Sequence, residues 1–234
     1  MSLPGRRLFQ SVALALPLLA AAAIAAPLHV TLNFASLPSA QGFTYLAEGV
    51  DTGMPESSVF SVSGGVLSQN TLGCALGGAG ADVLYQRSGG ISSDDSKQIR
   101  FRARCTSAAG ATGAGGMAVG FSNGFLAFEV SITPTQVFTL NGGGRAAAPA
   151  TFDNTQFHDY VFDWSPPNSY RVYRDGVLID TRSGGFPSGA SQILIGDMTG
   201  GANAAGEFAW IDFVQDLTTP VTPSSWGRIK SLYR

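Results

Sequence analysis

The stretch from residue 157 to residue 180, FHDYVFDWSPPNSYRVYRDGVLID, decides the fold of this chain. Its first eight residues alternate with the period of two that is typical of a β-strand with two distinct faces. The prolines at 166 and 167 cannot donate to a strand ladder, so the chain turns there. A second alternating run, Tyr170 to Arg174, ends at Asp175-Gly176, the dipeptide that a two-residue type I′ hairpin favours. The stretch therefore predicts an antiparallel meander whose third strand begins at Val177.

Outside this meander the sequence predicts further short strands separated by glycine-rich turns, and no helical apolar period of useful length. Residues 107–116, a low-complexity Gly/Ala/Ser segment, and residues 196–206 are expected to be loops. The pattern predicts an all-β, antiparallel two-sheet sandwich. The additional strands are expected at residues 28–34, 43–46, 58–62, 66–70, 82–86, 97–105, 117–121, 125–132, 136–140, 192–195 and 208–215.

The composition bounds the class of protein. The 234 residues include 30 glycines and carry a formal net charge of only −2, so no basic field for nucleic acid is present. Residues 26–216 have the length of one sandwich domain that can bury a sizeable core.

The N-terminus has the pattern of an export signal. Arg6 and Arg7 precede an apolar run, Leu8 to Ile24, and Ala23-Ile24-Ala25 fits an A-x-A cleavage site. The run is short for a membrane anchor, and the flanking residues fit the twin-arginine pattern poorly. Residues 1–25 are therefore predicted to be a signal peptide, and the mature protein to be secreted, at the cell surface or in a periplasm.

The chain has two cysteines, Cys74 and Cys105. In an oxidising compartment such a pair predicts a disulfide, which would stabilise the fold by about 3–4 kcal/mol. A metal pair is the alternative, but neither cysteine has another Cys or His at ligand spacing.

Several segments together resemble the concanavalin A-like lectin/glucanase superfamily, which includes laminarinase-type glycoside hydrolases and laminin-G-like domains. The resemblance is carried by Phe157-His158-x-Tyr160, Trp164, residues 173–178, Ile195-Gly196-Asp197 and residues 209–214, with a vaguer match over 116–130. It implies two curved antiparallel sheets, with ligands bound on the concave face or its rim loops. It also implies a structural calcium on the convex side, for which Asp212 occupies the matching position.

The glycosidase machinery of that family is incomplete here. Retaining hydrolysis needs two carboxyl groups about 5–5.5 Å apart, which laminarinase-type enzymes supply from one strand as Glu-x-Asp-x-x-Glu or a variant one residue longer. The matching strand, residues 125–132, offers Glu129 alone. Glu207 and Asp212 are five positions apart and would point to opposite faces of a regular strand. Glu129 is therefore interpreted as a solvated or hydrogen-bonded strand carboxylate.

A polysaccharide lyase would need a His or Tyr base beside a neutralising side chain. Gln98-Ile99-Arg100 lacks the histidine of the corresponding lyase motif, and residues 170–174 lack the Tyr-x-Lys spacing. His158 is interpreted as a sheet residue that pairs with a cross-strand neighbour.

Two groups of residues are candidates for glycan binding. Arg100, Arg102 and Arg104 share one face of a strand and could recognise an acidic polysaccharide. Alternatively, this face is merely solvated and neutralised by Asp94 and Asp95. A neutral sugar would instead stack on aromatic rings, for which the candidates are Trp164, Tyr173 and Trp210, although tryptophans in a sandwich often belong to the core.

Residues 217–234 form a Thr/Pro-rich linker and a basic, aromatic tail. Trp226, Ile229 and Tyr233 have helical spacing, so the tail is either a short amphipathic helix that docks to an envelope or sorting partner, or a frayed terminus.

The sequence thus favours a secreted, non-catalytic carbohydrate-binding or bacterial cell-surface protein whose partner is a polysaccharide or other glycan. A divergent hydrolase or lyase is the first alternative, and a structural or adhesive envelope component sorted by its tail is the second.

Overall fold

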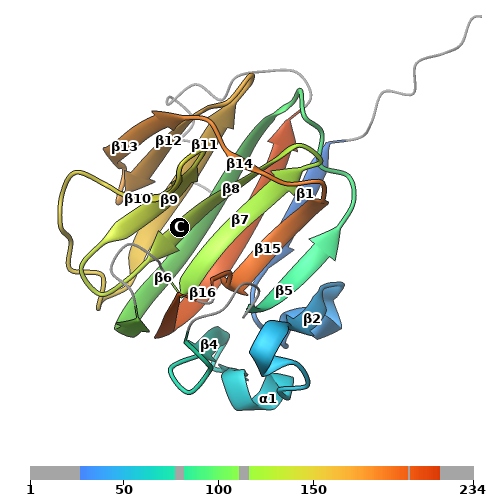
Figure 1. Cartoon of the computed structure of the whole chain (residues 1–234), viewed down its shortest axis with the longest axis vertical. Coiled ribbons are helices and arrows are strands. Elements are labelled where there is room, and N and C mark those ends of the chain that lie inside the picture. Colours follow the sequence, from blue (N-terminus) through green and yellow to red (C-terminus); the bar gives the residue numbers. More distant parts are fainter. Residues whose placement is uncertain (1–26, 77–81, 111–115, 200, 217–234) are drawn as a thin grey trace, which may run out of the picture.

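The computed structural model of the chain describes residues 27–76, 82–110, 116–199 and 201–216. The predicted signal peptide and the predicted C-terminal tail lie outside these residues. The described residues form two antiparallel sheets of eight strands each, which confirms the predicted jelly-roll sandwich (Figure 1). Within them, no helix has the length and apolar character that crossing a membrane requires.

Sheet A contains the central meander. Its strand order is β13-β12-β11-β6-β16-β4-β3, and β1 also pairs with β16. The bounds are β1 (Leu28–Leu32), β3 (Phe60–Ser63), β4 (Val66–Asn70), β6 (Ser96–Gly110), β11 (His158–Ser165), β12 (Ser169–Arg174), β13 (Val177–Ser183) and β16 (Ala202–Asp216).

Sheet B covers the other side of the core. Its strand order is β10-β9-β8-β7-β15-β5-β2, and β14 pairs with β8. The bounds are β2 (Thr44–Ala47), β5 (Val83–Ser88), β7 (Met117–Asn123), β8 (Leu126–Ile132), β9 (Val137–Asn141), β10 (Gly144–Ala147), β14 (Phe186–Pro187) and β15 (Ser191–Asp197). Three short helical turns, η1 (Pro38–Gln41), η2 (Gly49–Asp51) and α1 (Glu56–Val59), complete the described structure.

The predicted meander is confirmed as β11, β12 and β13. Arg174 pairs with Val177, so Asp175 and Gly176 are the two turn residues. Both have positive φ, 51° and 80°, as a type I′ turn requires.

Three predicted boundaries are wrong. The segment 107–116, expected to be a loop, is in part a strand, because β6 continues to Gly110 and pairs there with Ala202 of β16. Strand β16 in turn begins inside the second expected loop, residues 196–206. Small residues allow these two strands to approach closely: a Cβ at Gly206 would collide with the carbonyl oxygen of Arg104. The expected strand at 58–62 begins only at Phe60, after the turn α1.

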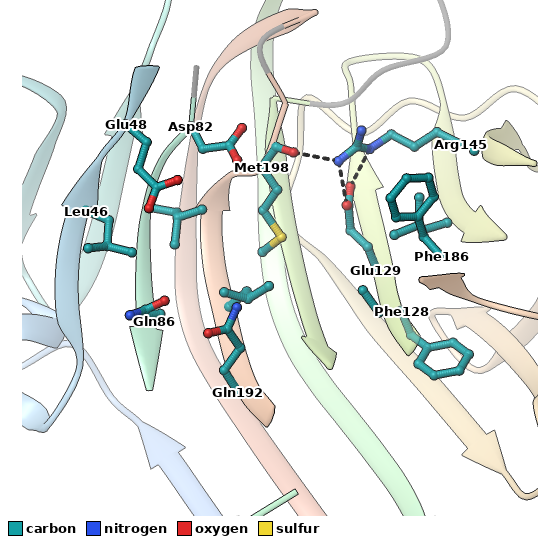
Figure 2. A pocket seen from close by; sticks show the side chains of 15 residues that line it. Leu46, Glu48, Asp82, Gln86, Phe128, Glu129, Arg145, Phe186, Gln192 and Met198 are labelled. Carbon is teal, nitrogen blue, oxygen red and sulfur yellow. Dashed lines mark hydrogen bonds and ion pairs between the residues drawn. The ribbon is translucent and has the colours of Figure 1, made fainter. Parts of the chain in front are cut away.

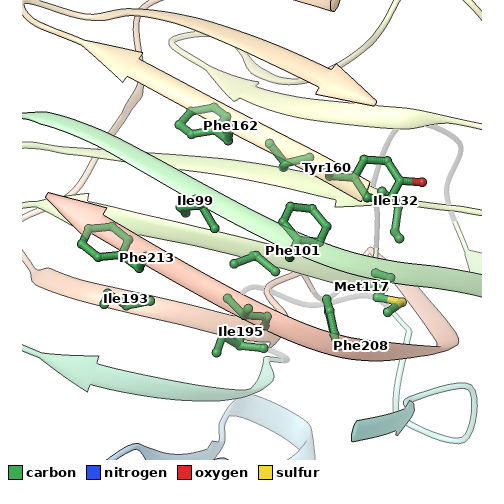
Figure 3. Close-up of a cluster of buried hydrophobic side chains, with 14 of the residues drawn as sticks. Ile99, Phe101, Met117, Ile132, Tyr160, Phe162, Ile193, Ile195, Phe208 and Phe213 are labelled. Atoms are coloured by element: carbon green, nitrogen blue, oxygen red, sulfur yellow. The ribbon is translucent and has the colours of Figure 1, made fainter. Parts of the chain in front are cut away.

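The core lies between the sheets and is rich in aromatic rings (Figure 3). Alternate residues of β6, including Ile99 and Phe101, point inward as predicted, while the arginines between them point outward. Phe101 stacks on Tyr160 with ring centroids 5.0 Å apart. Truncating one such buried ring to alanine typically costs about 3–5 kcal/mol.

The structure corrects the predicted disulfide, since Cys74 and Cys105 are both buried free thiols. The Cys105 sulfur contacts the carbonyl oxygen of Ser107 at 3.4 Å, whereas the Cys74 sulfur lies 3.5 Å from the sulfur of Met54. Each thiol contacts a different neighbour, and the two sulfurs do not form a disulfide. Burial raises the pKa of Cys74 to about 11 and that of Cys105 to about 12, which leaves both thiols unreactive at neutral pH.

Candidate functional site

A hollow of about 330 Å³ opens on the outer face of sheet B (Figure 2). Ligand pockets in proteins begin at about this size. The hollow is lined by Leu46, Glu48, Asp82, Leu84, Gln86, Ala127, Phe128, Glu129, Leu140, Gly144, Arg145, Phe186, Gln192, Leu194 and Met198.

Strand register brings the lining residues together from distant parts of the sequence. On β7, Gly120 pairs with Glu129 of β8 on one side and with Leu194 of β15 on the other, and Leu194 in turn pairs with Gln86 of β5. The position between Glu129 and Leu194 therefore carries no side chain. Any Cβ there would collide with the backbone, 2.5 Å from the carbonyl oxygen of Phe128.

One wall of the hollow holds a buried ion pair. The Arg145 guanidinium donates to both carboxylate oxygens of Glu129, at 2.9 and 2.7 Å, and to the carbonyl oxygen of Met198 at 2.7 Å. Burial disfavours the charge of Arg145, but Glu129 outweighs this effect and holds the pKa of Arg145 above its usual value. Glu129 is thus the hydrogen-bonded strand carboxylate that the sequence suggested.

The opposite wall carries two more carboxyl groups. The Glu48 backbone N–H donates to the carbonyl oxygen of Asp82 at 2.9 Å, which extends the pairing of β2 with β5. Burial, and then the neighbouring charge of Glu48, raise the pKa of Asp82. In Figure 2 both side chains face the hollow across from Arg145 and Glu129.

Asp197 lies at the end of β15, directly before Met198 of the hollow. Its carboxyl group accepts hydrogen bonds from the Thr71 hydroxyl at 2.7 Å and from the Thr199 backbone N–H at 3.2 Å. Burial raises the pKa of Asp197 to about 8, so this carboxyl group is largely protonated at neutral pH.

The predicted arginine stripe lies on the outer face of sheet A, away from the hollow. Arg102 forms an ion pair with Asp159 at 3.0 Å, and Arg104 forms one with Glu207 at 2.8 Å. Arg100 donates to the side chain of Gln98. The partners of Arg102 and Arg104 are therefore cross-strand neighbours and that of Arg100 lies on the same strand, rather than the Asp94 and Asp95 that the sequence suggested.

The predicted aromatic platform is not one surface. Trp164 is 0% exposed in the core beneath the ammonium of Lys97, which lies 4.2 Å from its ring centroid, so Trp164 cannot stack on a sugar. This prediction is wrong because the inward face of β11 takes the ring. Tyr173 and Trp210 are half-buried on the outer face of sheet A, where Trp210 lies opposite Arg102.

Asp212 and His158 also lie on sheet A. The Asp212 carboxylate is within hydrogen-bond distance of the His29 ring at 2.6 Å and accepts a hydrogen bond from the Thr31 hydroxyl at 2.8 Å. Across the described ranges, no cluster of three or more His, Cys, Asp or Glu side chains has a metal-binding arrangement. Calcium binding by Asp212 stays a prediction. The His158 ring lies 2.7 Å from the carboxylate of Asp175, so its partner comes from the turn between β12 and β13 and not from a paired strand as predicted.

Comparison with solved structures finds chains that share this jelly-roll fold. The carbohydrate esterase of the Shiga toxin-encoding bacteriophage phi24B is similar at a TM-score of 0.51 and 14% identity, over 80% of this chain and 97% of that one. A prokaryotic β-1,3-1,4-glucanase (lichenase) from a mouse hindgut metagenome has a TM-score of 0.50 and 13% identity, over 83% and 99% of the two chains. The sequence matches no protein-family model and no curated protein.

Sequence reasoning found Glu129 but missed its surroundings. Glu48 directly follows β2 and Asp82 directly precedes β5, and nothing in the linear order shows that they lie side by side on one wall of the hollow. Arg145 follows the glycine-rich turn after β9 and had no visible partner. Only the alternation of β5 and β15, which turns Gln86 and Gln192 outward, was a usable signal.

Proposed function

We propose that this protein binds a neutral polysaccharide in the hollow of sheet B and does not cleave it. The observation that carries the proposal is the mixed lining of this hollow, in which amides and carboxyl groups alternate with apolar side chains. Pyranose rings carry hydroxyl groups at their edges and apolar C–H faces, so they fit such a surface. The similarity of the fold to a glucanase and a carbohydrate esterase agrees with a role toward carbohydrate.

Free amides support recognition of hydroxyl groups. Gln86 and Gln192 lie on the adjacent strands β5 and β15, both half-buried and both lining the hollow. Within the described part of the chain, neither amide hydrogen-bonds to another side chain or to the backbone. An amide that has both a donor and an acceptor available suits a hydroxyl ligand.

The charge of the hollow favours a neutral ligand. Glu48, Asp82 and Glu129 face a single cation, Arg145, which Glu129 already pairs. A polyuronate or sulfated chain would bring further negative charge to this surface, which costs binding energy. Acidic polysaccharide therefore remains a ligand only for the arginine stripe of sheet A.

The geometry of Glu129 argues against hydrolysis. A glycosidase nucleophile must present a carboxylate oxygen to the anomeric carbon. Both oxygens of Glu129 accept hydrogen bonds from Arg145, which lowers their nucleophilicity and fixes them toward the wall. Both histidines of the chain lie on sheet A, so neither can act as a base in the hollow.

Affinity electrophoresis tests the proposal. Migration of the wild-type protein should be retarded in gels that contain soluble β-1,3-1,4-glucan and unchanged in gels that contain alginate. The variants Gln86→Ala and Gln192→Ala should each weaken this retardation about tenfold, while Gln41→Ala, whose amide donates to the Ser36 carbonyl oxygen and does not line the hollow, should migrate like the wild type. Stronger retardation by alginate than by glucan, or equal retardation of the Gln192 variant and the wild type, would refute the proposal.

A divergent hydrolase is the second candidate, favoured by one specific observation. Asp82, whose raised pKa suits a general acid, shares the hollow with the carboxyl group of Glu129. Release of reducing ends from β-glucan, lost in Asp82→Asn, would establish this alternative. Wild-type protein that binds glucan without releasing reducing ends would exclude it for that substrate.

Export and surface attachment complete the proposal. The predicted signal peptide would place the binding domain outside the cytoplasm, and the basic, aromatic tail would dock it to an envelope partner. Cell fractionation after deletion of residues 224–234 tests the tail. Cell association that persists after this deletion would contradict its sorting role.

A further inference from the structure

Two exposed aromatic rings adjoin the hollow without belonging to the core. Phe125 is 71% exposed and Phe186 is 49% exposed, and they are the exposed phenylalanines among the described residues. Phe186 lines the hollow, where Figure 2 places it beside Arg145. Phe125 does not line the hollow and directly precedes β8.

The backbone places both rings on the face of sheet B that carries the hollow. Phe186 pairs with Ala127, so it shares the face of Ala127 and Glu129. Phe125 directly precedes β8, and the hydrogen bond from the Ser188 N–H to its carbonyl oxygen continues the pairing of β14 with β8 by one residue, so we expect Phe125 on the same face. Phe125 and Phe186 are thus diagonal neighbours across β8 and β14, a spacing that aromatic side chains can span.

The backbone around Phe125 is held on both sides. Its carbonyl oxygen accepts a hydrogen bond from the Ser188 N–H at 2.9 Å, and its own N–H donates to the Asn123 side chain at 3.1 Å. The ring is therefore presented from a fixed backbone. An exposed apolar group in a fixed position costs little further entropy when a ligand covers it.

We propose that Phe125 and Phe186 form an aromatic subsite that stacks on the sugar rings next to those held in the hollow. The inference rests on the proposed glycan-binding function and specifies its ligand. The ligand is an internal segment of a long chain of pyranose units with accessible C–H faces, because a short oligosaccharide that fills the hollow would not reach Phe125.

The surroundings of the two rings favour a sugar over a protein partner. Asn123, Gly124 and Ser188 flank Phe125, so polar and glycine residues border the Phe125 ring on one side, and Leu126 and Pro187 are the other apolar residues beside the two rings. A stable protein interface buries about 800 Å² on each partner, far more than two rings provide. A saccharide ring needs only one aromatic face, and these faces continue the line of the hollow along β8.

Isothermal titration with two ligands tests the subsite. Soluble β-1,3-1,4-glucan probes the whole track, and a trisaccharide of the same linkages probes the hollow alone. Phe125→Ala, which removes the ring that does not line the hollow, should bind the polymer about tenfold more weakly and the trisaccharide within about twofold of wild type. Phe125→Tyr, which keeps the ring, should restore polymer affinity. Val177→Ala, at an equally exposed site that is 65% accessible on sheet A, is the matched control.

The outcomes separate this inference from the proposed function. Unchanged polymer affinity in Phe125→Ala, with binding still weakened in Gln192→Ala, would overturn the subsite and leave the hollow as the binding site. Equal weakening of both ligands by Phe125→Ala would also overturn it, because the Phe125 ring would then belong to the hollow. Wild-type protein that binds neither ligand would refute both proposals.

Discussion

At the scale of single residues, Asp197 is the side chain whose ionisation most affects the fold near the hollow. Its carboxyl group is 2% exposed and is held by Thr71 and Thr199. Burial raises its pKa from 3.8 to about 8. The folded protein therefore keeps this proton over a pH range in which the unfolded chain has lost it.

This difference predicts that stability falls as pH rises from about 4 to about 8. Across that window the native state binds more protons than the unfolded state, so each increase in pH favours unfolding. The contribution is fully present below pH 3.8 and is lost as pH passes through about 8. Asp197→Asn, which cannot ionise, should reduce this loss of unfolding free energy by about 3 kcal/mol. Urea unfolding of the wild type and of the variant at pH 4.5 and pH 7.5 measures the difference. An identical pH dependence of the two proteins would contradict the raised pKa of Asp197.

At the scale of elements, the turn between β12 and β13 isolates the effect of backbone conformation. Gly176 has a φ of 80°, and a Cβ built there meets no atom within 4 Å. Any cost of adding a side chain at this position therefore arises from the backbone angle and not from packing.

Gly176→Ala should accordingly lower the free energy of unfolding by about 1 kcal/mol. Gly189→Ala is the matched control, because a Cβ at Gly189 also meets nothing within 4 Å and its φ is outside the left-handed region. The midpoints of thermal unfolding of the two variants can be compared directly. A smaller effect at Gly176 than at Gly189 would mean that the turn is not type I′ in solution.

The strands and turns also show which parts of the structure the sequence could and could not predict. Local signals sufficed for the meander, since alternation, prolines and Asp175-Gly176 act within a few residues. They failed where a long-range partner decides the outcome: β6 extends to Gly110 only because β16 pairs with it. The alternation of residues along β11 predicts that Trp164 shares a face with Phe162, but it does not show that this face lies in the core. The hollow could not be predicted, because Glu48 and Asp82 come to lie side by side, across from Arg145 and Glu129, only in the folded sheet.

At the scale of the whole molecule, the two outer faces differ in how their polar groups are used. On sheet A the charges are largely engaged with one another, as in the pairs of Arg102 with Asp159 and of Arg104 with Glu207. On sheet B, the amides of Gln86 and Gln192 and the carboxyl groups of the far wall face an open hollow. Groups that are already paired gain little from a ligand, whereas unpaired groups exchange water for ligand hydrogen bonds. The sheet B face is therefore the better recognition surface.

This contrast predicts that binding of neutral glycan maps to one face. Trp210→Ala and Tyr173→Ala, on sheet A, should leave the affinity for soluble β-1,3-1,4-glucan within about twofold of wild type, whereas Gln192→Ala, on sheet B, should lower it about tenfold. Circular dichroism confirms that each variant is folded, and the Kd values come from titrations at fixed ionic strength. If Trp210→Ala lost glucan binding and Gln192→Ala kept it, the binding site would lie on sheet A, where Tyr173 and Trp210 would form the aromatic surface that the sequence suggested. Binding of alginate that depends on Arg102 would instead assign each face its own ligand, because only the arginine stripe offers guanidinium groups to a polyanion.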